Sequence, residues 1–436
     1  MVTYHNISYT KVINAVKSKD PKTLVIKIGT SSICDEKTHY PLLSNLSRIV
    51  ETILHLKTLG HRVVLVTSGA VGVGLLNLGL VEKPKSRAAI QAIAAVGQGR
   101  LMSMYDDLFG RFNQPIAQIL LTRNDLADRS QYLNAVNCLT ELLDMDIVPI
   151  VNENDTISDG AVRFGDNDTL SAITAGMVRA DYLFLMTDVD CLYTDNPRTK
   201  PDARAVLVCD NIEKLRKEVC VTSMGSSLGT GGMMTKLVAA ELATAAGVTT
   251  IIARGSTPEN IIPIITQDMA STTTTPLHTR FLPNAEPLVD RKWWILHGLH
   301  TAGTIEIEDE QVLLPSSNAS SDSDSEDGIR TPSNESTDSL FEVSSFPAMA
   351  VKSIKGSFIE HQAVNIVVRR RCSQKNERGE TTTGDDAVTI AKGIVNFSSA
   401  EIIRILEANK NNKMDTFGYD INNTYLMNPD NIAVYA

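Results

Sequence analysis

Residues 147–168, IVPIVNENDTISDGAVRFGDND, combine a short apolar segment with a long polar one. Residues 147–151 are apolar around one proline, which predicts a short strand buried on both faces. From Asn152 onward, amides and carboxylates follow in quick succession up to Asp168. Unpaired buried charges cost several kcal/mol each, so this segment cannot belong to the core. It is either a solvated surface loop or a polar binding site.

The pattern of an apolar strand that ends in polar residues occurs four more times, at residues 24–28, 63–66, 115–121 and 182–186. Apolar residues at helical spacing occupy most of the intervals between these strands. This alternation predicts an α/β fold with an open, mostly parallel sheet and helices on both faces.

Ligands of such sheets bind outside the carboxyl ends of the strands. The polar residues at the five predicted strand ends begin at Gly29, Thr67, Thr122, Asn152 and Thr187. Because parallel strands end at the same edge of a sheet, these groups should lie close together. Their convergence favours a binding site over a solvated loop at residues 152–168.

Residues 225–236, GSSLGTGGMMTK, precede a helix that is predicted to begin near Met233. Glycines allow main-chain N–H groups to approach an anion, and a helix N-terminus adds a partial positive charge. The segment is neither a Walker A loop, since Thr235 precedes Lys236, nor a dinucleotide fingerprint, since Met234 stands in place of the last glycine. It predicts phosphate binding, with a flexible glycine-rich linker as the alternative.

Two lysines stand at unusual places. Lys27 lies within an apolar strand, where an unpaired charge is disfavoured. Lys236 falls in a predicted first helical turn, where acidic residues are preferred. Both positions suit contact with a bound anion, although a structural ion pair and an exposed lysine remain the alternatives. The polar strand ends contain no histidine that could serve as a base, which argues against a hydrolase.

The composition is that of a globular protein of more than one domain, with 436 residues and 43% hydrophobic residues. A net charge of −10 argues against nucleic acid or an anionic membrane as a partner. The six cysteines form no C-x-x-C pair, so neither a structural zinc site nor a disulfide framework is expected. The sequence shows no signal peptide and no apolar run of about 18 residues. We therefore expect a cytoplasmic protein without a membrane span.

The sequence pattern divides the chain into an N-terminal extension (1–21), the α/β domain (22–285) and a small β-rich domain (286–436). Within the last domain, strands are predicted at residues 293–295, 303–307, 351–354, 363–368 and 387–395, and a helix near 399–408. An acidic, serine-rich insertion at about 315–340 is almost devoid of apolar residues, which predicts disorder.

Several segments together resemble the glutamate 5-kinases of the amino-acid kinase superfamily. They are LVIKIGTSS (24–32), VVLVTSGAVGVG (63–74), QILLTRNDLADRSQYLNA (118–135), VPIVNENDTI (148–157), FGDNDTLSA (164–172), LMTDVDCLYTDNPR (185–198) and GTGGMMTK (229–236). The resemblance is colinear over residues 22–285. The C-terminal part resembles the PUA domain that some members carry.

The resemblance implies that ATP and L-glutamate react to ADP and γ-glutamyl phosphate, the first step of proline biosynthesis. A γ-carboxyl with a pKa of about 4.3 is ionised at neutral pH, so no general base is needed. By the same resemblance, Lys27 and Lys236 are catalytic and stabilise the transferred phosphoryl group, Asp168 orients both lysines, and Mg²⁺ lies between the phosphates.

The resemblance also implies residues for both substrates. The residues expected to bind ATP are Lys27, Thr187, Asp188, Thr230, Gly231, Gly232, Met233, Met234, Thr235 and Lys236. The residues expected to bind glutamate are Ser68, Gly69, Ala70, Asp155 and Asn167. The family further implies feedback inhibition by proline through the 155–167 loop, a homodimer or homotetramer, and functional coupling to glutamyl phosphate reductase.

Three alternatives stay open. Kinases of acetylglutamate, aspartate, carbamate or nucleoside monophosphates would share the nucleotide half of the site, and only residues 152–168 argue for free glutamate. An RNA-binding or RNA-modifying protein would suit a PUA-like domain, but the acidic charge balance argues against it. A catalytically inactive amino-acid sensor is disfavoured because Lys27 and Lys236 are both present.

Overall fold

The computed structural model divides into two compact units, Met1–Leu288 and Val289–Ala436. The structure describes residues 18, 20–158, 167–195, 200, 202–219, 232–266, 275–285, 287–288, 290–308, 313, 345–375, 381–410 and 424–435. Most of the N-terminal extension and all of the acidic insertion predicted at 315–340 lie outside these residues. No helix in the described parts of the chain is long and apolar enough to cross a membrane.

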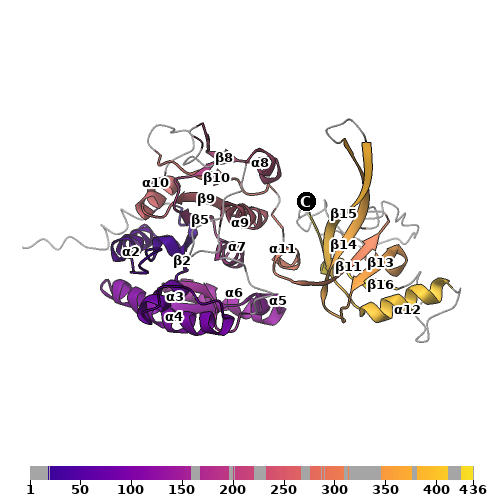
Figure 1. Ribbon diagram of the computed structural model, residues 1–436, viewed down its shortest axis with the longest axis horizontal. Helices are drawn as coiled ribbons and strands as arrows, with labels where there is room; N and C mark the ends of the chain where they lie inside the picture. The colour runs from indigo at the N-terminus through magenta and orange to yellow at the C-terminus, as the bar shows by residue number, and fades with distance from the viewer. Residues whose placement is uncertain are drawn as a thin grey trace, which may run out of the picture. The chain divides into compact units, whose positions relative to one another are not determined.

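The first unit is built on an eight-stranded sheet with the order β3-β4-β2-β1-β5-β9-β10-β8 (Figure 1). Its strands are β1 (Thr23–Ile28), β2 (Arg62–Val66), β3 (Ile116–Leu121), β4 (Val148–Glu153), β5 (Tyr182–Thr187), β8 (Val208–Cys209), β9 (Thr249–Arg254) and β10 (Thr279–Phe281). Neighbouring strands pair in parallel except β9 and β10, which are antiparallel. The predicted open, mostly parallel sheet is confirmed. Strands β6 (Leu192–Tyr193) and β7 (Ala205–Val206) form a separate pair.

Helices cover both faces of this sheet, as predicted. They are α2 (Leu43–Thr58), α3 (Ala70–Asn77), α4 (Arg87–Gly110), α5 (Arg123–Ala127), α6 (Arg129–Asp144), α7 (Asn167–Met177), α8 (Ile212–Glu218), α9 (Met233–Ala245) and α10 (Ile261–Thr266). Side chains alternate along a strand, so Leu24, Ile26 and Ile28 of β1 share one core with α2, α4 and α10. Lys27 points to the opposite face, toward α7 and α9. Figure 1 shows the strands between α2 and α10 on one side and α7 and α9 on the other.

Strand β1 lies at the point where the strand order reverses. It pairs with β2 on one side and with β5 on the other. The chain passes from β1 to β2 and reaches β5 only after β3 and β4 are complete. Ligands of open α/β sheets bind at such a reversal, beyond the carboxyl ends of the strands. The fold therefore places Lys27, next to the last residue of β1, at the expected position for a ligand.

The second unit is β-rich, with a five-stranded sheet of the order β13-β11-β14-β15-β17 and a two-stranded β12–β16 pair. Its strands are β11 (Thr301–Ile307), β12 (Phe346–Pro347), β13 (Val351–Gly356), β14 (Ala363–Lys375), β15 (Thr381–Ile394), β16 (Tyr425–Met427) and β17 (Ile432–Val434). Helix α12 (Ser399–Lys410) packs on a core that includes Phe346, Val364 and Ile402.

The strand predicted at residues 293–295 is wrong. These residues lie in helix α11 (Asp290–His297), where Trp293 to Leu296 are all buried. A short, continuous apolar run has neither strand nor helix periodicity, so its pattern alone does not distinguish a buried strand from a buried helix.

Candidate active site

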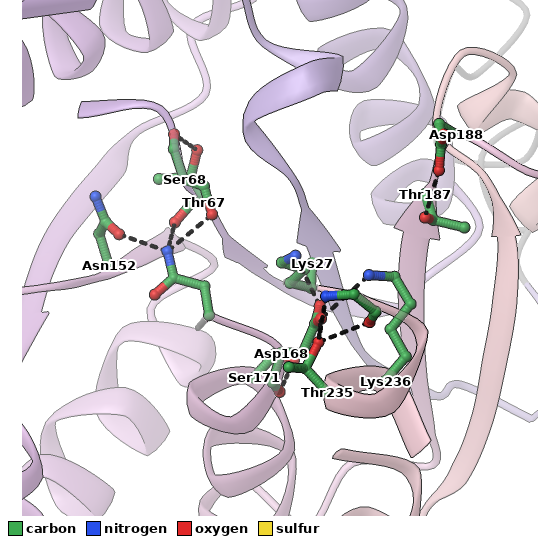
Figure 2. A network of polar contacts seen from close by, with 12 residues as sticks. Lys27, Thr67, Ser68, Asn152, Asp168, Ser171, Thr187, Asp188, Thr235 and Lys236 are labelled. Atoms are coloured by element: carbon green, nitrogen blue, oxygen red, sulfur yellow. Dashed lines mark hydrogen bonds and ion pairs between the residues drawn. The ribbon is translucent and has the colours of Figure 1, made fainter. Parts of the chain in front are cut away.

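The centre of the site is a buried carboxylate shared by two lysines. Asp168 lies in the first turn of α7 with no exposed surface. Its Oδ1 is 2.7 Å from Lys27 Nζ, and its Oδ2 is 3.1 Å from Lys236 Nζ. The side chains of both lysines are less than a tenth exposed, at 7% and 8%. Residues from β1, α7 and α9 therefore meet at one point, as Figure 2 shows.

The charge balance of this cluster favours an anion. Burial alone would raise the pKa of Asp168, but the charges of Lys27 and Lys236 outweigh burial and hold that pKa well below its usual range. Asp168 is thus ionised at neutral pH, and two ammonium groups share one negative charge. Buried charges need compensation, and an anionic ligand beside the lysines would supply it.

The end of the glycine-rich segment is attached to the same carboxylate. Thr235 Oγ1 donates to Asp168 Oδ2 at 2.8 Å and accepts from the main-chain N–H of Gly232 at 3.1 Å. Helix α9 begins at Met233, where the sequence predicts it, with Gly232 at its N-cap. Met234 is exposed. Of the residues expected at the nucleotide, Thr230 and Gly231 lie outside the described part of the chain.

Asn167 links the helix of Asp168 to the end of β2. Its Nδ2 lies 2.7 Å from Thr67 O, 2.9 Å from Ser68 Oγ and 2.9 Å from Asn152 Oδ1, so its two N–H donors are shared among three acceptors. The carbonyl of Thr67 can only accept, so the amide nitrogen of Asn167 must face it. Asn167 consequently presents its Oδ1, an acceptor, on the side away from these three partners.

The sequence did not identify the α4 residues that hold Asn152 and Thr67, the partners of Asn167. Buried Asn152 donates through Nδ2 to Gln98 Oε1 at 2.8 Å and accepts the N–H of Glu153 through Oδ1. Thr67 Oγ1 lies 2.9 Å from the hydroxyl of Tyr105, whose pKa burial raises to about 12. Gln98 and Tyr105 belong to α4, far from these partners in the sequence. Their only signal is a polar atom on a buried helix face.

Helix α3 begins at Ala70, with Gly69 as its N-cap, shortly after β2 ends at Val66. Gly69 has φ of +98°, a left-handed conformation that a residue with a side chain rarely adopts, so the turn requires glycine. The first N–H groups of a helix have no partner within the helix and can bind a ligand. This arrangement is compatible with main-chain donors at Gly69 and Ala70.

Thr187 and Asp188 lie at the other flank of the cluster. Thr187 ends β5 and its hydroxyl donates to Asp188 Oδ1 at 3.2 Å. Because β1 lies between β2 and β5, the lysine cluster separates Thr187 and Asp188 from Ser68 and Asn152, as Figure 2 also shows. Asp155 lies in the turn after β4. The described residues contain no group of three or more His, Cys, Asp or Glu that could hold a metal ion.

Comparisons with known proteins identify the family. Residues 22–254 match the model of the Amino acid kinase family. The chain belongs to the amino acid kinase family. Among its relatives, the probable glutamate 5-kinase of Schizosaccharomyces pombe is 57% identical over 291 residues, which are 66% of this chain and 72% of that protein. The glutamate 5-kinase of Nostoc punctiforme is 42% identical over 398 residues, 91% of this chain and 95% of that protein.

Among solved structures, the carbamate kinase of Giardia lamblia bound to AMP-PNP is 17% identical to this chain. The similarity covers 61% of this chain and 100% of that chain, with a TM-score of 0.43. The sequence relatives confirm the resemblance of the motifs to glutamate 5-kinases, and the chain is an enzyme of the glutamate 5-kinase type.

Proposed function

We propose that this kinase transfers the terminal phosphoryl group of ATP to the γ-carboxylate of L-glutamate, in the first step of proline biosynthesis. The observation that carries the proposal is the pair of buried lysines on Asp168 at the edge of the sheet. The names of the Schizosaccharomyces pombe and Nostoc punctiforme relatives support glutamate as the acceptor.

The chemistry fits the residues. A γ-carboxylate oxygen attacks the terminal phosphorus, the bond from that phosphorus to the bridging oxygen breaks, and ADP leaves with the electron pair. The carboxylate is ionised at neutral pH, so the lack of a histidine base is no obstacle. Lys27 and Lys236 stabilise the charge on the phosphoryl oxygens, while Asp168 positions both ammonium groups.

The nucleotide would bind at Thr187, Asp188 and the segment from Gly232 to Lys236. ATP fits this set, since two buried lysines and the N-terminus of α9 suit its phosphate oxygens. Mg²⁺ bound with the nucleotide would supply further neutralisation of the phosphate charge. Thr230 and Gly231 would extend this half of the site.

Glutamate would bind at Ser68, Gly69, Ala70, Asp155 and Asn167. The main-chain N–H groups of Gly69 and Ala70 would donate to its γ-carboxylate. The Oδ1 of Asn167 is an acceptor, so it would bind the α-ammonium group together with Asp155.

The wider role is proposed from the same family relation. Proline would inhibit the enzyme through the 155–167 loop, and the kinase would form a homodimer or homotetramer in the cytoplasm. Its unstable acyl phosphate would pass to glutamyl phosphate reductase. Residues 22–285 would form the kinase domain after the 1–21 extension, and residues 286–436 a PUA-like domain.

The test is release of ADP from ATP and Mg²⁺ with L-glutamate, in the presence of hydroxylamine to trap the acyl phosphate. Parallel reactions contain N-acetylglutamate, aspartate, carbamate, UMP or RNA, and proline is added to the active one. Glutamate-dependent hydroxamate is the expected product. Turnover with another acceptor alone would overturn the glutamate assignment.

A further inference from the structure

A pocket of about 150 Å³ lies between the start of α4 and the turn that follows β4. It is lined by Lys85, Arg87, Ile90, Gln91, Asp155 and Ser158. Of these residues, only Asp155 has a place in the proposed function. The other charged lining residues are Lys85, which precedes α4, and Arg87, the first residue of that helix.

Hydrogen bonds fix the position of the pocket wall. Arg87 Nη2 donates to the main-chain oxygen of Ser158 at 2.6 Å, and Gln91 Nε2 lies 3.5 Å from the same oxygen. The hydroxyl of Ser158 donates to Oε1 of the buried Glu153 at 2.6 Å. Because Glu153 is the last residue of β4, the guanidinium group of Arg87 is held against the sheet edge.

The lining carries both signs of charge on opposite elements. Lys85 and Arg87 bring two positive charges from the α4 side, and Asp155 brings a negative charge from the β4 side. Ile90 adds an apolar surface. A simple anion would match only the basic residues, and a simple cation would match only Asp155. A ligand that carries a carboxylate and an ammonium group on one carbon matches both.

We propose that this pocket binds the zwitterionic head of an α-amino acid, with its carboxylate at Arg87 and Lys85 and its ammonium group at Asp155. The assignment rests on the proposed function, in which Asp155 already contacts the amino-acid substrate. It adds Arg87 and Lys85 as the residues that recognise the α-carboxylate. Glutamate as substrate and proline as inhibitor both carry this head.

The test compares ligands that lack one of the two groups. Glutarate keeps both carboxylates but lacks the ammonium group, and 4-aminobutyrate lacks the α-carboxylate. Inhibition constants for both are measured against glutamate in the full-length wild type, R87Q, K85Q and D155N. We expect R87Q to weaken the binding of glutamate and glutarate by about tenfold or more, because a charge-assisted hydrogen bond to the α-carboxylate is lost. The affinity for 4-aminobutyrate should not change. D155N should instead weaken the binding of glutamate and 4-aminobutyrate, the two ligands that carry the ammonium group.

The matched control is K83Q, which removes a positive charge two residues before Lys85 from a side chain that does not line the pocket. K83Q should bind glutamate, glutarate, 4-aminobutyrate and proline as the wild type does. Thermal unfolding of each variant verifies that the fold is retained.

Calorimetric binding of glutamate and proline keeps this proposal separate from the proposed function. If the wild type forms no hydroxamate that depends on glutamate, the proposed function is overturned. The calorimetric affinities still show whether the pocket binds an amino acid. Weaker glutamate binding in R87Q assigns the pocket to the substrate, weaker proline binding assigns it to the inhibitor, and either supports the proposal. Unchanged affinity for both amino acids in R87Q and K85Q would overturn it.

Discussion

At the scale of single residues, the chemistry depends on one buried carboxylate between two lysines. In Asp168→Asn the ammonium groups of Lys27 and Lys236 lose their shared counter-charge and repel each other. We expect kcat to fall by at least about 100-fold, and the free energy of unfolding near pH 7 to fall by about 3–5 kcal/mol, the usual cost of breaking a buried ion pair. Steady-state kinetics and urea unfolding measure the two effects.

The pH dependence of that loss distinguishes charge from packing. Since the folded-state pKa of Asp168 is depressed, its stabilisation is full above the unfolded pKa of about 3.9. It is lost as the pH falls from there toward the lower folded pKa. The stability difference between wild type and D168N should therefore shrink below about pH 4. A difference that stays constant down to pH 2.5 would contradict an ionic role.

A second residue-scale prediction concerns Asn152, which positions Asn167 without a proposed contact to substrate. Asn152→Ala removes one of the three acceptors of Asn167 Nδ2 and the link to Gln98. We expect KM for glutamate to rise about tenfold, because a misplaced amide forfeits a hydrogen bond of about 1–2 kcal/mol, while KM for ATP stays unchanged. The matched control is Asn154→Ala, whose side chain contacts only Thr156 among the hydrogen bonds described here. Equal effects in both variants would contradict the positioning role.

At the scale of elements, the contact between α3 and α4 determines where the N-terminus of α3 lies. A Cβ atom at Gly97 would come within 1.7 Å of Ala70 O, in the first turn of α3. One at Gly74 would come within 2.1 Å of Ile93 O in α4. The two helices thus pack with their backbones in contact, which only glycine permits.

Gly97→Ala should therefore destabilise the fold by more than about 3 kcal/mol and weaken glutamate binding, because α3 must move. Gly99→Ala is the matched control in the same helix, since a Cβ at Gly99 meets nothing within 4 Å. It should stabilise the protein by about 0.5–1 kcal/mol through helix propensity. Chemical unfolding measures both, and opposite signs for the two alanines are the expected result.

At the scale of the whole molecule, every described residue of the proposed site belongs to the first of two compact units. The sheet, Asp168 and the Asn167 network lie before residue 289, and the second unit has its own core. Residues 1–288 alone should therefore fold and phosphorylate glutamate with kcat within about fivefold of the full chain. The hydroxamate assay and circular dichroism test this prediction, with the same fragment carrying Lys236→Ala as the inactive control. A folded but inactive fragment would contradict it.

The sequence by itself determined the strands β1 to β5 of the first unit and the start of α9. It did so because the signals of strands and helices, short apolar segments and helical periodicity, are read from residues that lie close together in the sequence. It also singled out Lys27 and Lys236, since a charge in an apolar strand or a lysine in a first helical turn is locally anomalous, whereas the role of Asp168 came only from the resemblance to the family. The strand predicted at 293–295 failed where that local pattern was absent.

The tertiary structure decided which of these residues meet. That one carboxylate holds both lysines follows from the packing of α7 and α9 on the same face of β1. Gln98 and Tyr105 are paired with Asn152 and Thr67 only because α4 packs against this part of the fold. The pocket at Arg87 likewise depends on a hydrogen bond to Ser158, 71 residues away. Contacts between residues so far apart in the sequence produce no periodic pattern in it, because each partner is compatible with many local sequences.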